Sequence, residues 1–354
     1  MPVVDDSVGR PCDAEFRWPI SDTMTLPLIQ ETPSGLYCSI GDFHIDPCRC
    51  VRRAVVTHAH ADHARPGSQS YLAAREGRRV LRTRLGPSAE IEALPYGEKK
   101  AINGVTLSFH PAGHILGSAQ VRVEYRGEVS VVSGDYKTEP DATCAAFEPV
   151  RCHTFITEST FGLPIYRWPA QQEIFADINR WWKQCRAAGK PAVLLAYALG
   201  KAQRLIAGVD SSIGPIYCHP SVQLMNDDYR ASGVQLPKTW LSTQAPARKD
   251  WSGVLVVAPP SMANSAWLAR FGSASIAMVS GWMLTRQTRK SQSFEIGFPL
   301  SDHADWPGLL LAIDESHAEQ ILVTHGQTEN MVRWLNENGR NARAVAICTA
   351  HGSS

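Results

Sequence analysis

Short apolar runs that end in polar residues recur along the chain. The run "RAVVTHAH" predicts a buried strand from Ala54 to Thr57, followed at once by His58 and His60. The run "EVSVVSGD" predicts another strand from Val129 to Val132, with Asp135 just beyond it. Each strand therefore delivers an ionisable side chain at its carboxyl end.

Further strand ends follow the same pattern. "HTFITEST" ends in Glu158, "QILVTHG" ends in His325, and "TLSFHPAGHILGSAQVRVEY" places His114 in a glycine-bounded loop between two strands. We expect these side chains to share one site along one edge of a sheet.

Apolar positions at a spacing near 3.6 residues predict helices between the strands. They are "PAQQEIFADINRWWKQCRAAG" (169–189), "GKAQRLIAGV" (200–209) and "ADWPGLLLAIDES" (304–316). Strands alternating with helices indicate an α/β protein. The length of 354 residues is enough for roughly two domains.

In the stretch "THAHADHARPGS", the six positions 58–63 contain four potential metal ligands: His58, His60, Asp62 and His63. Neutral imidazole nitrogens and carboxylates are metal ligands, and two histidines one residue apart at a strand end can face the same cavity. Asp62 and His63 can face a second ion beside the first. Asp135 is the natural bridging carboxylate.

His114 would complete the set of ligands around the first ion, and His325 that around the second. Two ions about 3.5–4 Å apart can share a water and lower its pKa. The sequence therefore predicts two divalent ions, zinc or alternatively manganese, since His/Asp ligand sets accept both.

Composition indicates a core-forming protein, with 44% hydrophobic and 19% charged residues. No apolar run approaches the ~20 residues that span a bilayer, so no membrane partner is expected. The N-terminus shows no secretion signal, and nine scattered cysteines without a C-x-x-C pair favour free thiols. We expect a cytoplasmic protein.

Charge is divided unevenly along the chain. Residues 165–295 hold 15 Lys/Arg against 7 Asp/Glu, a balance of +8, which leaves 20 against 27, or −7, for the remainder. A basic segment inserted into an acidic protein suits a polyanionic partner. Lys201, at a predicted helix start, and the cluster containing Arg286 and Arg289 are candidate phosphate contacts, although solvated basic residues would look the same.

These motifs resemble two related families. H-x-H-x-D-H at 58–63, Gly113-His114 and "SGD" ending at Asp135 resemble the metallo-β-lactamase fold, in which Asp46 of "HIDP" would support the ligands. "TESTFG", "SDHAD" and "VTHGQTENM" resemble motifs A, B and C of the β-CASP nucleases. The resemblance spans residues 40–335.

The resemblance implies an αββα metallo-β-lactamase sandwich carrying an inserted β-CASP cap domain. Residues 1–164 and 296–354 would form the core and residues 165–295 the cap. The stretch "RAVVTHAHADHARPG" and the compact length of the chain are most similar to those of the bacterial ligase-associated DNA exonucleases. This resemblance implies an ATP-dependent DNA ligase and a helicase as partners.

The implied reaction is phosphodiester hydrolysis. A metal-bridging hydroxide, with Asp62 among its supports, would attack phosphorus. His303 of motif B would act as general acid, with Glu158 of motif A hydrogen-bonded to its other ring nitrogen.

DNA is the expected substrate in bacterial repair, but a histidine at motif C, here His325, is typical of the RNA-cleaving branch. An RNA-processing nuclease is therefore the alternative. A non-catalytic scaffold is disfavoured because every expected ligand is present. A small-molecule hydrolase would need neither the motifs nor the basic insert.

Overall fold

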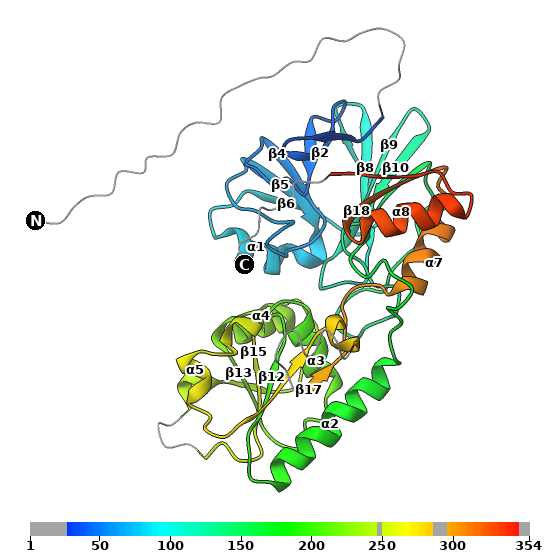
Figure 1. The fold of residues 1–354 in the computed structure, drawn as a ribbon. Coiled ribbons are helices and arrows are strands. Elements are labelled where there is room, and N and C mark those ends of the chain that lie inside the picture. The colour runs from blue at the N-terminus through cyan, green and yellow to red at the C-terminus, as the bar shows by residue number, and fades with distance from the viewer. Residues whose placement is uncertain (1–26, 246–249, 286–295, 347–354) are drawn as a thin grey trace, which may run out of the picture.

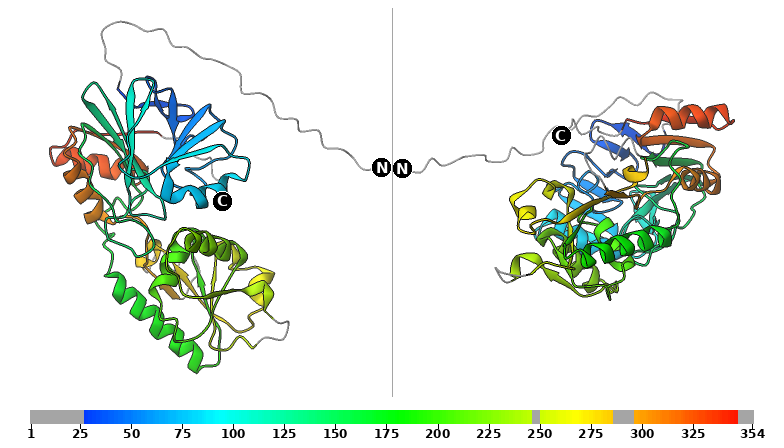
Figure 2. Two further views of the ribbon diagram at one scale, coloured as in Figure 1. Left: turned by 180° about the vertical axis from the view of Figure 1, so that it is seen from behind. Right: turned by 60° about the horizontal axis from the view of Figure 1, so that its bottom comes forward.

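The computed structural model describes residues 27–245, 250–285 and 296–346. Figures 1 and 2 show two bodies joined along one side, the sandwich and the parallel-sheet body. The sandwich comprises the elements from β1 to β11 and from α7 to β19, and the parallel-sheet body those from α2 to β17.

Two mixed sheets form the sandwich. The first has the order β1 (Gln30–Thr32), β2 (Gly35–Cys38), β3 (Phe43–Ile45), β4 (Arg53–Val56), β5 (Ser70–Ala74) and β6 (Ile91–Leu94). The second has the order β19 (Ala342–Ala344), β18 (Gln320–Gly326), β11 (Thr154–Ser159), β10 (Glu128–Val132), β9 (Ala119–Tyr125), β8 (Val105–Pro111) and β7 (Lys100–Ile102).

Helices cover the outer faces of these sheets. Val55 and Leu72 of the first sheet share one core with Leu107 and Val121 of the second. Helix α1 (Arg78–Leu85) packs on the outside of the first sheet, and α7 (Trp306–Ser316) and α8 (Thr328–Glu337) pack on the outside of the second. The layers are therefore αββα, in agreement with the α/β fold expected from the sequence.

A third, wholly parallel sheet builds the other body. Its order is β14 (Thr239–Leu241), β13 (Ile216–Cys218), β15 (Leu255–Ala258), β12 (Ala192–Leu195), β16 (Ser275–Val279) and β17 (Ile296–Phe298). The helices α2 (Gln171–Ala187), α3 (Lys201–Gly208) and α4 (Pro220–Ala231) pack on one face and α5 (Ala266–Ala269) on the other. Strand β12 is buried throughout, as expected for a parallel strand covered on both faces.

The helices that the apolar spacing predicted are all present. The predicted ranges 169–189, 200–209 and 304–316 correspond to α2, α3 and α7. Helix α2 is two residues shorter at each end and α3 one, whereas α7 begins two residues later and ends where predicted. The strands predicted before His58 and Asp135 are β4 and β10.

Helix α4 docks the parallel-sheet body against the sandwich. Thr83 of α1 donates a hydrogen bond to the Asp228 carboxylate at 2.6 Å. The Leu116 backbone N–H donates to the buried Tyr229 hydroxyl at 3.1 Å. These contacts join the two bodies beside the loops that follow β4 and β8.

Of the helices in the described part of the chain, none has the length and apolarity needed to cross a bilayer. Free thiols are found at Cys38, Cys50, Cys144, Cys152, Cys185 and Cys218.

Candidate metal centre

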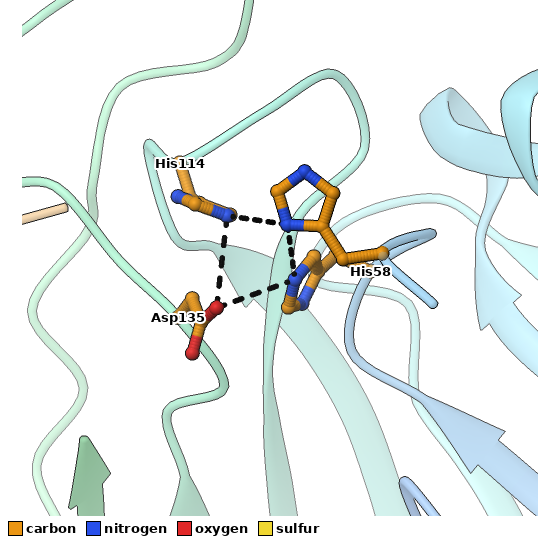
Figure 3. A group of neighbouring side chains, drawn as sticks. His58, His114 and Asp135 are labelled. Carbon is orange, nitrogen blue, oxygen red and sulfur yellow. Dashed lines mark hydrogen bonds and ion pairs between the residues drawn. The ribbon is translucent and has the colours of Figure 1, made fainter. Parts of the chain in front are cut away.

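Loops at one edge of the sandwich bring four donor residues together. His58 and His60 follow β4, His114 lies in the loop between β8 and β9, and Asp135 follows β10. The loop after β4 closes as a tight turn, in which the Ala64 N–H donates to the His60 carbonyl at 2.8 Å. Strand ends from both sheets thus supply one cluster, which Figure 3 shows.

The donor atoms of this cluster converge on one point. His60 Nδ1 lies 3.1 Å from both His58 Nε2 and His114 Nε2. Asp135 Oδ2 lies 3.5 Å from His58 Nε2 and 3.8 Å from His114 Nε2. A tetrahedral ion with bonds of roughly 2.0–2.1 Å separates its ligand atoms by about 3.3–3.4 Å. The four side chains therefore fit a divalent metal ion.

Oxygen atoms hold the opposite nitrogen of each imidazole ring. The Thr57 hydroxyl lies 3.0 Å from His58 Nδ1, and the Leu199 carbonyl lies 3.2 Å from His60 Nε2. The Asp302 carbonyl lies 2.7 Å from His114 Nδ1. Partners of this kind fix the tautomer and orientation of metal-binding histidines.

Next to this cluster, a second and looser group contains the other predicted ligands. His63 Nε2 lies 3.5 Å from Asp135 Oδ2 and 3.8 Å from Asp62 Oδ2. The rings of His63 and His325 have centroids 5.3 Å apart. His63 Nε2 is buried without a hydrogen-bond partner among the described residues. Such an orphaned nitrogen, facing the shared carboxylate, fits a second ion.

Asp46 supports this second group. Its carboxylate accepts from His63 Nδ1 at 2.7 Å and from the Thr57 N–H and hydroxyl at 2.8 and 2.5 Å. Asp46 and His325 both have positive φ, +46° and +54°, a backbone conformation that is uncommon outside glycine. Such strain often accompanies functional sites, where the surrounding structure maintains it.

Burial and neighbouring charges shift the pKa values of these groups in opposite directions. Burial, reinforced by the nearby histidines, holds the pKa values of His58 and His114 well below the usual range. Both rings are therefore neutral and able to ligate. Burial also acts to lower the pKa of His63, but the Asp135 and Asp46 carboxylates outweigh it and raise that pKa.

A histidine–glutamate pair lies beside the cluster. His303, between β17 and α7, places Nδ1 2.9 Å from Glu158 Oε2 and Nε2 4.0 Å from Asp135 Oδ2. Glu158 Oε1 also accepts from the Tyr136 N–H at 2.8 Å. Burial opposes the charged imidazole, but Glu158 and then Asp135 raise the pKa of His303 to about 9.

Helix α3 reaches this centre through two buried cations. Lys201 Nζ lies 3.0 Å from Asp302 Oδ1, whereas the sequence indicated a phosphate contact. Arg204 donates to the carbonyls of Gly113 and His114 at 3.3 and 3.2 Å. Sequence reasoning missed Asp302 and Arg204 as contributors to the site. Asp302 lies in "SDHAD", from which only His303 was assigned a role, and Arg204 lies in no ligand motif.

A cavity of about 690 Å³ opens onto the centre between the two bodies. Its sandwich side includes His60, Asp62, Asp135, His303 and His325. Its opposite wall comes from the parallel-sheet body and consists of Tyr197, Ala198, Leu199, Lys201, Ser221, Leu224, Met225, Pro259, Ser280 and Trp282. Arg286 and Arg289, the other predicted phosphate contacts, lie outside the described residues.

The chain is similar in sequence and in fold to several known proteins. No protein-family model matches the chain. The chain is 30% identical over 315 residues to a protein of Opitutus terrae named "Probable DNA ligase", a match that covers 88% of the chain and 30% of that protein. It is 30% identical over 130 residues to "Endoribonuclease YSH1" of Gibberella zeae, covering 35% of the chain and 15% of that protein.

Drosophila melanogaster "Cleavage and polyadenylation specificity factor 73" is 29% identical over 126 residues, 34% of the chain and 18% of that protein. The chain thus spans less than a third of the length of these relatives. A solved structure, "Crystal Structure of a Protein of Unknown Function from Enterococcus faecalis V583", matches with a TM-score of 0.58 at 12% identity, over 85% of this chain and 80% of that one. That likeness concerns the fold alone.

The αββα layers, the convergent histidines and the relatives agree with one another. They agree with the resemblance of the chain to the β-CASP nucleases of the metallo-β-lactamase fold.

Proposed function

We propose that the protein is a metal-dependent nuclease that degrades DNA from an end during bacterial DNA repair. One observation carries the proposal: His60 and Asp135 of the candidate metal centre line the same cavity as His303, which is paired with Glu158. Hydrolysis of a phosphodiester needs both an electrophilic centre and a proton donor for the leaving oxygen.

The donor sets divide between two ions. One ion would be held by His58, His60 and His114. The other would be held by His63 with Asp62 and His325, and Asp135 lies between the two sets. When bound, zinc or manganese supplies Lewis-acid stabilisation of phosphate charge and lowers the pKa of water.

The chain itself positions the proton. His303 turns Nδ1 toward Glu158, which leaves Nε2 directed to the Asp135 side of the cavity. A protonated Nε2 there can donate to the departing 3′ oxygen. The Tyr136 N–H and His303 hold the same Glu158 carboxylate, so the imidazole is fixed before substrate arrives.

The relatives bear on the substrate from two directions. The match across 88% of the chain is to a protein named as a ligase, which supports DNA as the substrate and a ligase as a partner. A helicase is the further partner that the family resemblance implies. The shorter matches to named endoribonucleases favour RNA as the second candidate substrate. The proposed setting is the bacterial cytoplasm.

Matched single-stranded DNA and RNA, labelled separately at each end, test the proposal in zinc or manganese. We expect stepwise shortening of DNA that is abolished in Asp62→Ala and reduced on the order of 10²- to 10⁴-fold in His303→Ala. The control is His317→Asn, an exposed histidine at the far end of α7. Internal cuts confined to RNA would establish the second candidate instead.

A further inference from the structure

Large apolar side chains are exposed on the cavity wall of the parallel-sheet body. Tyr197 is 56% exposed and Leu224 is 51% exposed, and both line the cavity together with Met225 and Trp282. Apolar side chains that gather in one exposed patch mark sites of ligand or partner binding. Because they share a wall opposite the candidate metal centre, they suit an apolar or aromatic group of a ligand that binds there.

The same wall is poor in available positive charge. Among its described residues Lys201 is the one cation, and its ammonium lies 3.0 Å from Asp302 Oδ1 and 4.7 Å from the centroid of the Tyr197 ring. Arg84, on the sandwich side, uses Nε to bond the Ala59 carbonyl at 3.1 Å. The wall is therefore suited to an uncharged, flat group rather than to phosphate.

Tyr197 is tied closely to the metal centre along the chain. It lies in the segment between β12 and α3, two residues before Leu199, whose carbonyl contacts His60 Nε2 at 3.2 Å. On the other side, Phe161 packs against both His303 and Trp282, at ring-centroid distances of 6.0 and 4.6 Å. Trp282, which lines the cavity, is thus joined through Phe161 to His303.

We propose that Tyr197 forms a nucleobase subsite, on which the base next to the scissile phosphate stacks while the phosphate faces the metal centre. This inference rests on the proposed nuclease function. Every base presents a π-face, so such stacking holds a strand without reading its sequence. The cavity volume lies in the range of small-ligand sites, roughly 300–1,000 Å³, which suits nucleotides of an unpaired strand.

The test pairs Tyr197 variants with oligonucleotides that carry a base or an abasic sugar at the nucleotide to be released. We expect Tyr197→Ala to lower kcat/KM on the intact strand by about 5- to 150-fold and Tyr197→Phe to retain it. On the abasic strand, Tyr197→Ala and the wild type should be equal. An equal loss on both strands would overturn the stacking role.

Trp240→Ala is the matched control. Trp240 is also an exposed aromatic residue with a lysine ammonium over its ring, 5.3 Å away, but it does not line the cavity. We expect this variant to cleave both strands like the wild type. A loss as large as that of Tyr197→Ala would show a general effect of removing surface aromatics and would overturn the subsite.

A binding measurement separates this inference from the proposed function. A strand carrying 2-aminopurine at the same position is titrated with metal-free protein, and quenching of its fluorescence reports stacking. Quenching that is lost in Tyr197→Ala supports the subsite even without turnover. Binding without quenching, or absence of any binding, overturns the subsite, whereas the cleavage assay with labelled DNA and RNA decides the nuclease function separately.

Discussion

Each histidine of the candidate metal centre has two nitrogens with different surroundings. In His58, His60 and His114, one nitrogen points into the cluster and the other meets an oxygen atom. The strand-end pattern predicted which side chains would meet, because it depends on the alternation of residues in the sequence. It could not predict the Leu199 and Asp302 carbonyls, since a backbone oxygen carries no sequence signature.

The pairing of Glu158 with His303 makes a residue-scale prediction. Glu158→Gln preserves the side-chain shape and the acceptor for the Tyr136 N–H, but removes the charge that raises the His303 pKa. We expect kcat on single-stranded DNA to fall on the order of 10²-fold with metal content unchanged. In a His303→Ala background, Glu158→Gln should lower kcat little further. An equally large further loss of kcat there would show that Glu158 does not act through His303.

Asp46 allows a second prediction at this scale. Its carboxylate bonds His63 Nδ1, and partners of metal-binding histidines contribute to affinity. Asp46→Ala should weaken binding of the second ion by about 10- to 100-fold and leave the first unchanged. Competition with a chelator measures both affinities, and Asp46→Asn should recover part of the loss. A uniform weakening of both ions would contradict the assignment.

Helix α3 brings two side chains of the parallel-sheet body into contact with residues of the metal centre. The apolar spacing of 200–209 predicted the helix, but not that its Lys201 and Arg204 would be buried against the sandwich. The sequence charge predicted that the insert, which supplies the cavity wall opposite the sandwich, would be basic. In the described residues that wall is largely apolar, because the Lys201 ammonium faces Asp302 and several basic residues of the insert lie elsewhere.

Arg204 tests how far α3 stabilises the site. Its side chain is fully buried and its Nε lies 3.5 Å from Asp141 Oδ2, so Arg204→Met leaves a 7% exposed carboxylate without its cation. We expect a loss of about 3–5 kcal/mol in the free energy of unfolding, measured by urea denaturation. Arg204→Met with Asp141→Asn should recover part of this loss, and the absence of recovery would show that the ion pair is not the cause.

At the scale of the whole molecule, the candidate metal centre is built from both sheets of the sandwich and is held from the parallel-sheet body. The layers follow from the alternation of strands and helices, and the α/β class was predictable for that reason. The contacts of α4 with α1 and with Leu116 were not, because they pair residues more than a hundred positions apart. The relative placement of the two bodies is therefore a product of tertiary packing.

This arrangement predicts that metal binding stabilises the folded molecule. An ion that binds only the native state at a hundred times its Kd adds about 2.7 kcal/mol to the free energy of unfolding. We expect urea denaturation in zinc to show this gain over chelator, and His60→Ala to lose it. A native protein that binds zinc with no gain in stability would mean that the unfolded chain binds it equally well.

The order of the donors along the chain has a consequence for biosynthesis. The histidines at 58, 60 and 114 leave the ribosome early. The Leu199 carbonyl emerges after α2 and β12, and His303 and His325 emerge only after the whole parallel-sheet body. Domains generally fold as units during synthesis, N-terminal segments first. A nascent or truncated chain therefore holds an unfinished centre, and no fragment that stops short of His325 can assemble all of the ligands.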